Sequence, residues 1–316
     1  MKRPLRIVFM GTPMFAVGIL SALIDAGHNI VGVVTAPDKP AGRGQKPKPS
    51  DVKTYAESKG LKIFQPTNLK DPAFLAALKS LDANLQIVVA FRMLPEAVWK
   101  MPEYGTFNLH ASLLPEYRGA APIHWAIING ETKTGVTTFF IDEKIDTGAI
   151  ILQKETAIDT DETTGSLHDR LMQIGSQLVI DTVKLIAQGN VRTIVQPKES
   201  IVKMAPKLHK DNTKIDWQQT IDYIYNQIRG LDPFPSAWSH LINEGKTITV
   251  KIFGAEKLPC KHSDTTGSIL ATKSEIKVAV NGGYILVKEM QLPGKRKMDS
   301  RSLLNGYHFF SDAKMC

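Results

Sequence analysis

Three side chains of different chemical type stand out in the sequence: a carboxamide at Asn108, an imidazole at His110 and a carboxylate at Asp146. Residues 106–110 are typical of a short strand, and side chains two apart on a strand leave the same face. Asn108 can then donate a hydrogen bond beside an imidazole that exchanges protons, and a carboxylate from a nearby loop can orient and charge that imidazole. Transfer of a carbonyl group needs these three types of side chain. A satisfied hydrogen-bonding pair on a strand is the alternative interpretation.

The elements before this stretch indicate a parallel α/β sheet. Residues 6–10 form a predicted apolar strand that ends in Gly11-Thr12-Pro13, and a helix over about 15–26 and a strand over 30–35 follow. Ligands of such sheets bind beyond the carboxyl ends of the strands, so the glycine turn is a candidate wall of a site. No G-x-G-x-x-G follows the first strand, and the sequence contains no P-loop signature.

The remaining pattern predicts two domains. In residues 1–189 the same α/β rhythm continues. Helices are predicted at 51–59, 72–80, 122–128 and 163–188, and strands at 85–90, 106–110, 134–141 and 149–155. Residues 190–206 have weak periodicity and two prolines, and we interpret them as a linker. Residues 207–316 contain predicted short strands at 237–242, 247–253, 267–270, 276–280 and 284–290. Five short strands with turns between them are compatible with a small OB-like β-barrel.

Residues 36–50 interrupt the α/β rhythm. This segment has four basic residues, one acid, four prolines and two glycines, and it lacks apolar periodicity. Fifteen residues without secondary structure inside a compact domain are usually functional or mobile. The segment is therefore either a solvated connector or a basic flap that orders on a phosphate backbone, and its charge favours the flap.

The composition is ordinary for a globular protein, with 43% hydrophobic and 22% charged residues. No apolar run approaches the roughly 20 residues that span a bilayer, and two cysteines make no disulfide framework. We therefore expect a cytoplasmic protein, without a membrane partner and as a monomer. Residues 1–206 carry a net charge of +3 and residues 207–316 a net charge of +5. The excess in the last third fits a polyanionic partner such as RNA.

Several motifs together resemble those of the formyltransferases that use 10-formyltetrahydrofolate. In the first domain they are Phe9-Met10-Gly11-Thr12-Pro13, the loop 37–44, the runs 108–115 and 117–122, and Asp146-Thr147-Gly148. Beyond it they are Ala205-Pro206-Lys207, Ile215-Asp216-Trp217, the run 228–233 and Leu292-Pro293-Gly294-Lys295. The run 108–115 is shared by the whole group, whereas the basic loop and the C-terminal motifs narrow the resemblance to the methionyl-tRNA formyltransferase family. The resemblance covers nearly the whole chain.

This resemblance implies a Rossmann-like, mostly parallel catalytic domain over 1–189 and an OB-like domain over 207–316 that helps to hold tRNA. It implies transfer of a formyl group from 10-formyltetrahydrofolate, the co-substrate, to the α-amine of methionine on initiator methionyl-tRNA. Asn108, His110 and Asp146 match the catalytic trio of the family.

Binding residues follow from the same matches. The expected folate-binding residues are Ser112, Leu113, Leu114, Pro115, Phe91, Met93, Leu94 and Asp142. The expected contacts to substrate and tRNA are Gly11, Thr12, Pro13, Lys39, Arg43, Lys46, Arg118, Lys207, Lys295, Arg296 and Lys297. Arg43 matches the loop arginine that approaches the acceptor end of the tRNA. Arg118 could instead hold the Asp142-to-Asp146 loop by an ion pair.

Two positions depart from the family pattern. Many members have Ala-Tyr-Gly-Leu-Ile-Leu-Pro after the buried strand, whereas residues 90–95 are one residue shorter, and no role is assigned to Arg92. Met14 stands where an acid is common. Apart from His110, the histidines are scattered without metal-ligand spacing, so we expect no metal.

Two other functions are compatible with parts of the sequence. One is a formyl-folate enzyme that acts on a sugar nucleotide or a purine precursor, or that hydrolyses the cofactor. Such an enzyme has no need of a basic loop combined with a basic C-terminal domain. The other is a non-catalytic RNA-binding protein with the same two folds, against which the intact trio argues.

Overall fold

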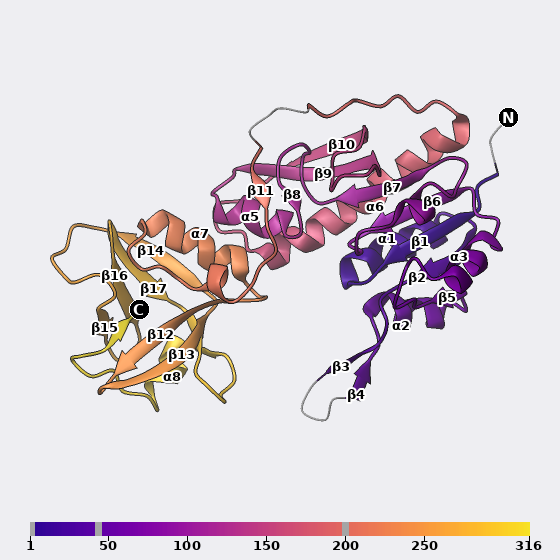
Figure 1. The fold of residues 1–316 in the computed structure, drawn as a ribbon. Helices are drawn as coiled ribbons and strands as arrows, with labels where there is room; N and C mark the ends of the chain where they lie inside the picture. The colour runs from indigo at the N-terminus through magenta and orange to yellow at the C-terminus, as the bar shows by residue number, and fades with distance from the viewer. Residues whose placement is uncertain (1–3, 42–45, 198–201) are drawn as a thin grey trace. The chain divides into compact units, whose positions relative to one another are not determined.

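The structure is a computed structural model that describes residues 4–41, 46–197 and 202–316. These residues form two compact units (Figure 1). The N-terminal unit comprises Met1–Gly119, Gly135–Thr156 and His168–Met204, and the C-terminal unit comprises Ala120–Thr134, Ala157–Leu167 and Ala205–Cys316. The units interleave in sequence, and the domain boundaries at residues 189 and 207 stay a prediction.

A seven-stranded sheet organises the N-terminal unit. Its strands, in spatial order, are β10 (Ile150–Ala157), β9 (Lys133–Phe140), β7 (Thr106–His110), β6 (Leu85–Val89), β1 (Ile7–Gly11), β2 (Ile30–Val34) and β5 (Ile63–Phe64). The five strands from β7 to β5 run parallel, whereas β9 joins β7 in antiparallel register. The predicted, mostly parallel α/β sheet is therefore confirmed. The carboxyl ends of β1, β6 and β7 meet at one edge of it.

Helices cover both faces of this sheet. They are α1 (Met14–Asp25), α2 (Asp51–Ser58), α3 (Pro72–Lys79), α4 (Glu96–Trp99) and α6 (Thr164–Gln188). Asp71 caps α3 by accepting from the N–H groups of Ala73 and Phe74, and Ser50 caps α2 in the same way. One apolar cluster joins Val8, Met10 and Val88 of the strands to side chains of α3 and α4. None of the helices in the described ranges is long and apolar enough to cross a bilayer.

The basic segment contains a hairpin, so the prediction of a stretch without secondary structure is wrong. Strands β3 (Lys39–Ala41) and β4 (Lys46–Lys48) pair in antiparallel register, with Lys39 opposite Lys48. The sequence does not reveal these strands because prolines at positions 40 and 47 mask the alternation. At the base of the hairpin Asp38 pairs with Lys53 at 2.6 Å and accepts a hydrogen bond from Gln65. These two hydrogen bonds hold the pKa of Asp38 below its usual range. Arg43 lies outside the described residues.

The C-terminal unit is built from short antiparallel strands around the amphipathic helix α7 (Ile221–Leu231). One sheet contains β19 (Met298–Asp299), β18 (Glu289–Gln291), β13 (Lys246–Ile252), β12 (Ala237–Asn243) and β20 (Lys314–Met315). The other contains β14 (Ala255–Pro259), β17 (Gly283–Val287), β16 (Ile276–Val280) and β15 (Ile269–Ala271). The predicted strands are confirmed, but these strands form two sheets and not one closed barrel. The chain leaves one sheet for the other at Gly254 and at Lys288. At these corners the Gly254 carbonyl accepts from the N–H groups of Lys288 and Glu289, at 2.8 and 3.2 Å.

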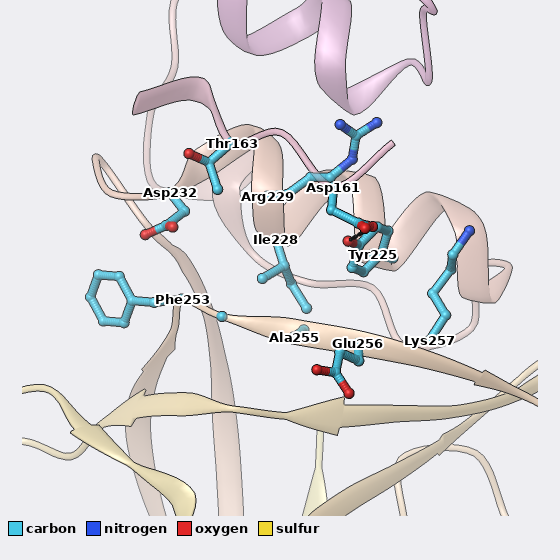
Figure 2. Close-up of a pocket in the computed structure, with 11 residues that line it drawn as sticks. Asp161, Thr163, Tyr225, Ile228, Arg229, Asp232, Phe253, Ala255, Glu256 and Lys257 are labelled. Atoms are coloured by element: carbon cyan, nitrogen blue, oxygen red, sulfur yellow. Dashed lines mark hydrogen bonds between the residues drawn. The ribbon is translucent and has the colours of Figure 1, made fainter. Parts of the chain in front are cut away.

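A hollow of about 570 Å³ opens beside α7 in this unit (Figure 2). The hydroxyl group of Tyr225 donates to Asp161 at 2.6 Å, and burial together with this bond raises the pKa of Tyr225 to about 12. Arg229 donates to the carbonyl of Glu162 at 2.9 Å. The polar groups around the hollow therefore mostly satisfy one another. The exception is Asp232, whose Oδ1 is buried without a hydrogen-bond partner among the described residues.

This unpaired carboxylate predicts a pH-dependent effect of Asp232→Asn on stability. Burial raises the pKa of Asp232, and the nearby positive charge of Lys297 only partly offsets the shift. A carboxyl group whose pKa is higher in the folded than in the unfolded protein stabilises the fold at pH values below its unfolded pKa, which is near 4. This contribution is lost as the pH rises through the folded pKa. Asp232→Asn should therefore raise the free energy of unfolding at pH 7 by up to about 1 kcal/mol. The gain should vanish toward pH 4 in urea titrations.

Asp211→Asn is the matched control, because the Asp211 side chain is 95% exposed in the same unit. Equal effects of the two substitutions, or a gain at Asp232 that does not depend on pH, would contradict the assigned cause.

Candidate active site

The imidazole of His110 and the carboxylate of Asp146 lie next to each other in the N-terminal unit. His110 is the last residue of β7, and Asp146 lies in the loop between β9 and β10. His110 Nδ1 and Asp146 Oδ2 are 3.9 Å apart, and both side chains are largely buried. This distance is beyond a hydrogen bond but short enough for a strong effect of one charge on the other.

The other ring nitrogen fixes the tautomer of His110. Nε2 lies 2.8 Å from the carbonyl oxygen of Tyr117, which can only accept a hydrogen bond. Nε2 therefore carries the proton in the neutral ring, and Nδ1 presents its lone pair on the side of Asp146. When Nδ1 takes up a proton, the positive ring faces the carboxylate.

Asn108 stands two residues before His110 on the same face of β7, as predicted. Its side chain is only partly buried, and no described residue forms a hydrogen bond with its carboxamide. The amide hydrogens are therefore available to a third molecule. Leu109, on the opposite face of the strand, packs against Gly175 of α6, which fixes the strand from behind.

A set of backbone contacts holds the loop that carries Asp146. The N–H of Gly119 donates to Asp146 Oδ2 at 2.9 Å. Gly148 has no room for a side chain, because a Cβ there would lie 1.7 Å from the carbonyl oxygen of Phe140. Asp146 itself has φ 55°, the left-handed region that non-glycine residues avoid. The carboxylate is thus held in place by a constrained backbone.

Two polar side chains, the partly buried Arg118 and the buried Gln196, also reach this loop. Arg118 Nε donates to the Asp146 carbonyl oxygen at 3.1 Å. Gln196 donates to the carbonyl oxygens of Asp146 and Gly148 at 3.0 and 2.7 Å. Arg118 therefore does hold the loop, but through the backbone and not by the ion pair considered from the sequence. Its expected contact with tRNA stays a prediction.

The segment after β7 is the predicted folate-binding segment. Ser112 is fully buried, and its hydroxyl group donates to the Glu116 carbonyl at 2.6 Å. Leu114 packs with Phe139 and Ile150, and its peptide bond to Pro115 is cis. Leu113 lies against Gly135, where there is no side chain to displace it. The structure brings these predicted residues together beside the strand of Asn108 and His110.

Thr137 and Gln153 support this segment, and sequence reasoning missed both. Thr137 is fully buried on β9, donates to the Ser112 carbonyl at 2.6 Å and accepts from the Leu114 N–H at 3.2 Å. Gln153 on β10 donates to the Leu114 carbonyl at 2.8 Å. The only signal in the sequence is a polar residue inside a strand, which is too common to identify them.

The segment after β6 is the second predicted wall of the folate pocket. Leu94 is buried and Phe91 packs against the same apolar cluster, whereas Met93 is 65% exposed. Arg92 donates to the carbonyl oxygens of Thr67, at 2.9 Å, and of Pro66. Arg92, to which the sequence assigned no role, therefore ties this shortened segment to the chain before α3.

The remaining predicted residues have varied surroundings. Asp142 accepts from Lys144 N–H and from the Thr147 hydroxyl group, at 3.0 and 2.7 Å, and so closes the loop before Asp146. Gly11, Thr12 and Pro13 form the turn from β1 into α1, and Gly11 is buried. Exposed basic side chains are Lys39 in the N-terminal unit and Lys207, Lys295, Arg296 and Lys297 in the C-terminal unit. Lys297 pairs with Glu289 at 2.7 Å. The backbone of Lys46 lies in β4.

No group of three or more His, Cys, Asp or Glu side chains within 4–41, 46–197 and 202–316 is arranged to hold a metal ion. The side chains described at the site are an amide donor, an imidazole and a carboxylate.

Comparisons with known proteins show which family the chain belongs to. The family model described as formyl transferase matches residues 5–183, and the model of the formyl transferase C-terminal domain matches residues 207–308. The chain is 59% identical over 311 residues to the methionyl-tRNA formyltransferase of Flavobacterium johnsoniae, covering 98% of this chain and 99% of that protein. It is 51% identical over 319 residues to that of Bacteroides fragilis, covering 99% and 98%.

Solved structures share the fold at low sequence identity. HypX from Aquifex aeolicus, in complex with tetrahydrofolic acid, has a TM-score of 0.63 and 18% identity, covering 95% of this chain and 47% of that one. WlaRD, a sugar 3N-formyltransferase, has a TM-score of 0.62 and 20% identity, covering 93% and 100%. With both domain models matched and relatives at more than half identity, the chain belongs to the methionyl-tRNA formyltransferase family.

Proposed function

We propose that the chain transfers the formyl group of 10-formyltetrahydrofolate to the α-amine of methionine on initiator tRNA. The observation that carries the proposal is the 3.9 Å approach of the Asp146 carboxylate to the free nitrogen of His110, two residues from Asn108. The names of relatives that are 51% and 59% identical support the choice of substrate. The cytoplasmic location and the monomeric state predicted from the sequence belong to the same proposal.

The reaction forms a bond from the amine nitrogen to the formyl carbon and breaks the bond from that carbon to N10. The amine must attack as the free base, so it has to lose a proton, and N10 must gain one as it leaves. The amine is itself the nucleophile, and no side chain has to form a covalent bond. The residues of the chain therefore bind the developing negative oxygen, move a proton and hold two substrates.

Asn108 has the first of these tasks. Its carboxamide has no partner among the described residues and can donate a hydrogen bond to the oxygen of the formyl group as negative charge develops there. Loss of one such donor typically costs about 10²–10³ in rate.

His110 and Asp146 have the second task. Nδ1 of His110 accepts the proton, directly or through one water, and passes it on. The Asp146 carboxylate, 3.9 Å from Nδ1, stabilises the positively charged ring that exists between these two proton transfers. The Tyr117 carbonyl keeps the ring oriented throughout. General acid–base catalysis of this kind contributes about 10²–10⁴.

The third task, holding the folate, falls to the segment from Ser112 to Pro115. A flat, partly apolar ring system binds best where apolar walls meet a few fixed backbone donors and acceptors. The buried Leu114 and the backbone ordered by Thr137 and Gln153 fit this requirement. Phe91, Leu94, Met93 and Asp142 remain proposed members of the same pocket.

Substitutions of the trio test the proposed roles. Asp146→Ala and His110→Ala should lower kcat by about 10²–10⁴, and Asn108→Ala by about 10²–10³. The affinity for tetrahydrofolate, measured by calorimetry, should stay nearly unchanged because none of the three is a proposed folate anchor. Gln177→Ala is the control, since Gln177 is an exposed residue whose carboxamide donates to Asp181. Near-normal turnover of any trio variant would remove that residue from the scheme.

The substrate is tested by one comparison of acceptors. With 10-formyltetrahydrofolate in excess, we expect formyl transfer to methionyl initiator tRNA to exceed transfer to methionyl elongator tRNA, to an amino-sugar nucleotide and to water. A faster reaction with the sugar nucleotide would replace the proposed substrate. Absence of transfer to all four would favour the non-catalytic RNA-binding protein.

RNA binding is tested by the salt dependence of the apparent affinity for tRNA. Lys295 and Arg296 are exposed and have no ion-pair partner among the described residues. Removal of one phosphate-binding cation should lower the slope of log K against log salt by about 1, so Lys295→Ala with Arg296→Ala should lower it by about 2. Lys273→Ala removes an exposed charge from the β15–β16 turn and should leave the slope unchanged. Equal slopes for all proteins would rule out phosphate binding at the turn of Lys295 and Arg296.

A further inference from the structure

We infer that Gln196 is a positioning residue, which acts on catalysis only by holding the carboxylate of Asp146 beside His110. This inference rests on the proposed function, since it assumes that Asp146 assists the proton transfer. Gln196 lies within residues 190–206, where the sequence indicated only a linker. Its side chain is 4% exposed, which is unusual for glutamine in a connecting segment.

Both polar atoms of the Gln196 carboxamide form hydrogen bonds. Nε2 donates to the carbonyl oxygens of Asp146 and Gly148, on either side of Thr147, at 3.0 and 2.7 Å. Oε1 accepts from Nη2 and Nε of Arg118 at 2.6 and 3.2 Å. Carbonyl oxygens can only accept and a guanidinium can only donate, so the contacts fix the orientation of the amide.

No other side chain of this length can make these contacts. Glutamate offers acceptors alone and would face two carbonyl oxygens, whereas methionine offers no strong donor or acceptor. Arg118 also donates to the Asp146 carbonyl at 3.1 Å, and the next residue, Gly119, donates to the Asp146 carboxylate at 2.9 Å. Gln196 therefore closes a ring of contacts in which both the backbone and the side chain of Asp146 are held.

The loop needs such support because its backbone is strained. A left-handed φ of 55° at Asp146 costs free energy and persists only where the surroundings impose it. Without Gln196, the partly buried carbonyl oxygen of Asp146 and the buried one of Gly148 would have fewer partners, and the loop would be free to relax. The carboxylate would then move away from His110, and displacements of about 1 Å at such a site can cost about 10² in rate.

The backbone before Gln196 is also anchored. Ile194 and Ile150 exchange two backbone hydrogen bonds, each of 2.8 Å, so the segment runs beside the start of β10. Gln196 is thus carried on a fixed piece of chain that belongs to the same compact unit as Asp146 and Arg118. Its side chain can therefore hold the Asp146 loop in a fixed position and does not merely fill space.

The test compares Gln196→Glu and Gln196→Ala with the exposed control Gln177→Ala in formyl transfer to methionyl initiator tRNA. Gln196→Glu keeps the size of the side chain and an acceptor for Arg118, so it isolates the donor to the loop. We expect both Gln196 variants to lower kcat by about 10- to 100-fold. The KM values for tRNA and for 10-formyltetrahydrofolate should stay within about threefold, since Gln196 binds neither substrate in this scheme.

A double-mutant cycle separates positioning from a general loss of stability. Single-turnover rates are measured for Gln196→Glu in the natural background and in an Asp146→Ala background. If Gln196 acts through Asp146, its substitution should change the rate less than about twofold once the carboxylate is absent. Unfolding midpoints of all variants show that the compared proteins are folded at the assay temperature.

The possible outcomes are distinct. Full kcat in Gln196→Glu would overturn the inference, and so would an equal rate loss in both backgrounds, which would indicate a structural role. If Asp146→Ala alone retains normal turnover, the proposed role of Asp146 fails and the inference fails with it. If Asp146→Ala is impaired while Gln196→Glu is not, only the inference fails.

Discussion

The site depends on the position of one carboxylate. In the proposed mechanism Asp146 stabilises a protonated His110, and its loop has to keep a backbone conformation that is unfavourable by itself. Three kinds of contact maintain it: the N–H of Gly119 on the carboxylate, the missing side chain of Gly148, and the polar groups on the carbonyl oxygens. On the strand side, Leu109 packs on α6 and the Tyr117 carbonyl fixes the ring of His110. The pairing of β7 with β6 and β9 fixes the strand that carries His110.

The strand and loop positions of the site therefore differ in how much a single substitution nearby displaces them. Strand positions such as Asn108 and His110 are set by the pairing of β7 with β6 and β9, which the whole sheet stabilises. Loop positions such as Asp146 and Leu114 are set by a few buried or partly buried hydrogen bonds with Thr137, Gln153 and Gln196. Removal of one buried partner affects such loops directly, because few other contacts hold them.

The sequence predicted the parallel sheet well, because β-branched apolar runs alternate with helical patterns and have clear start signals such as Asp71 and Pro72. It also predicted which side chains of the site share a strand face, since that needs only the period of two. The sequence did not predict features that depend on contacts between segments far apart in the chain. The hairpin at Lys39 and Lys48 depends on pairing across prolines. The division of the C-terminal strands into two sheets depends on corners at Gly254 and Lys288. The support from Gln196 depends on a path of the connector that has no local signature.

The path of the connector has a consequence for dividing the chain into pieces. A fragment that ends at Gly189 contains Asn108, His110, Asp146 and the whole proposed folate segment. It lacks Gln196, whose carboxamide lies against the loop of Asp146. The end of the first domain that the composition predicts, at residue 189, therefore lies before a residue on which the proposed catalytic site depends. On the proposed roles, a minimal catalytic fragment has to include the connector at least as far as Gln196, although residues 190–196 contain no helix and only an isolated bridge to β10.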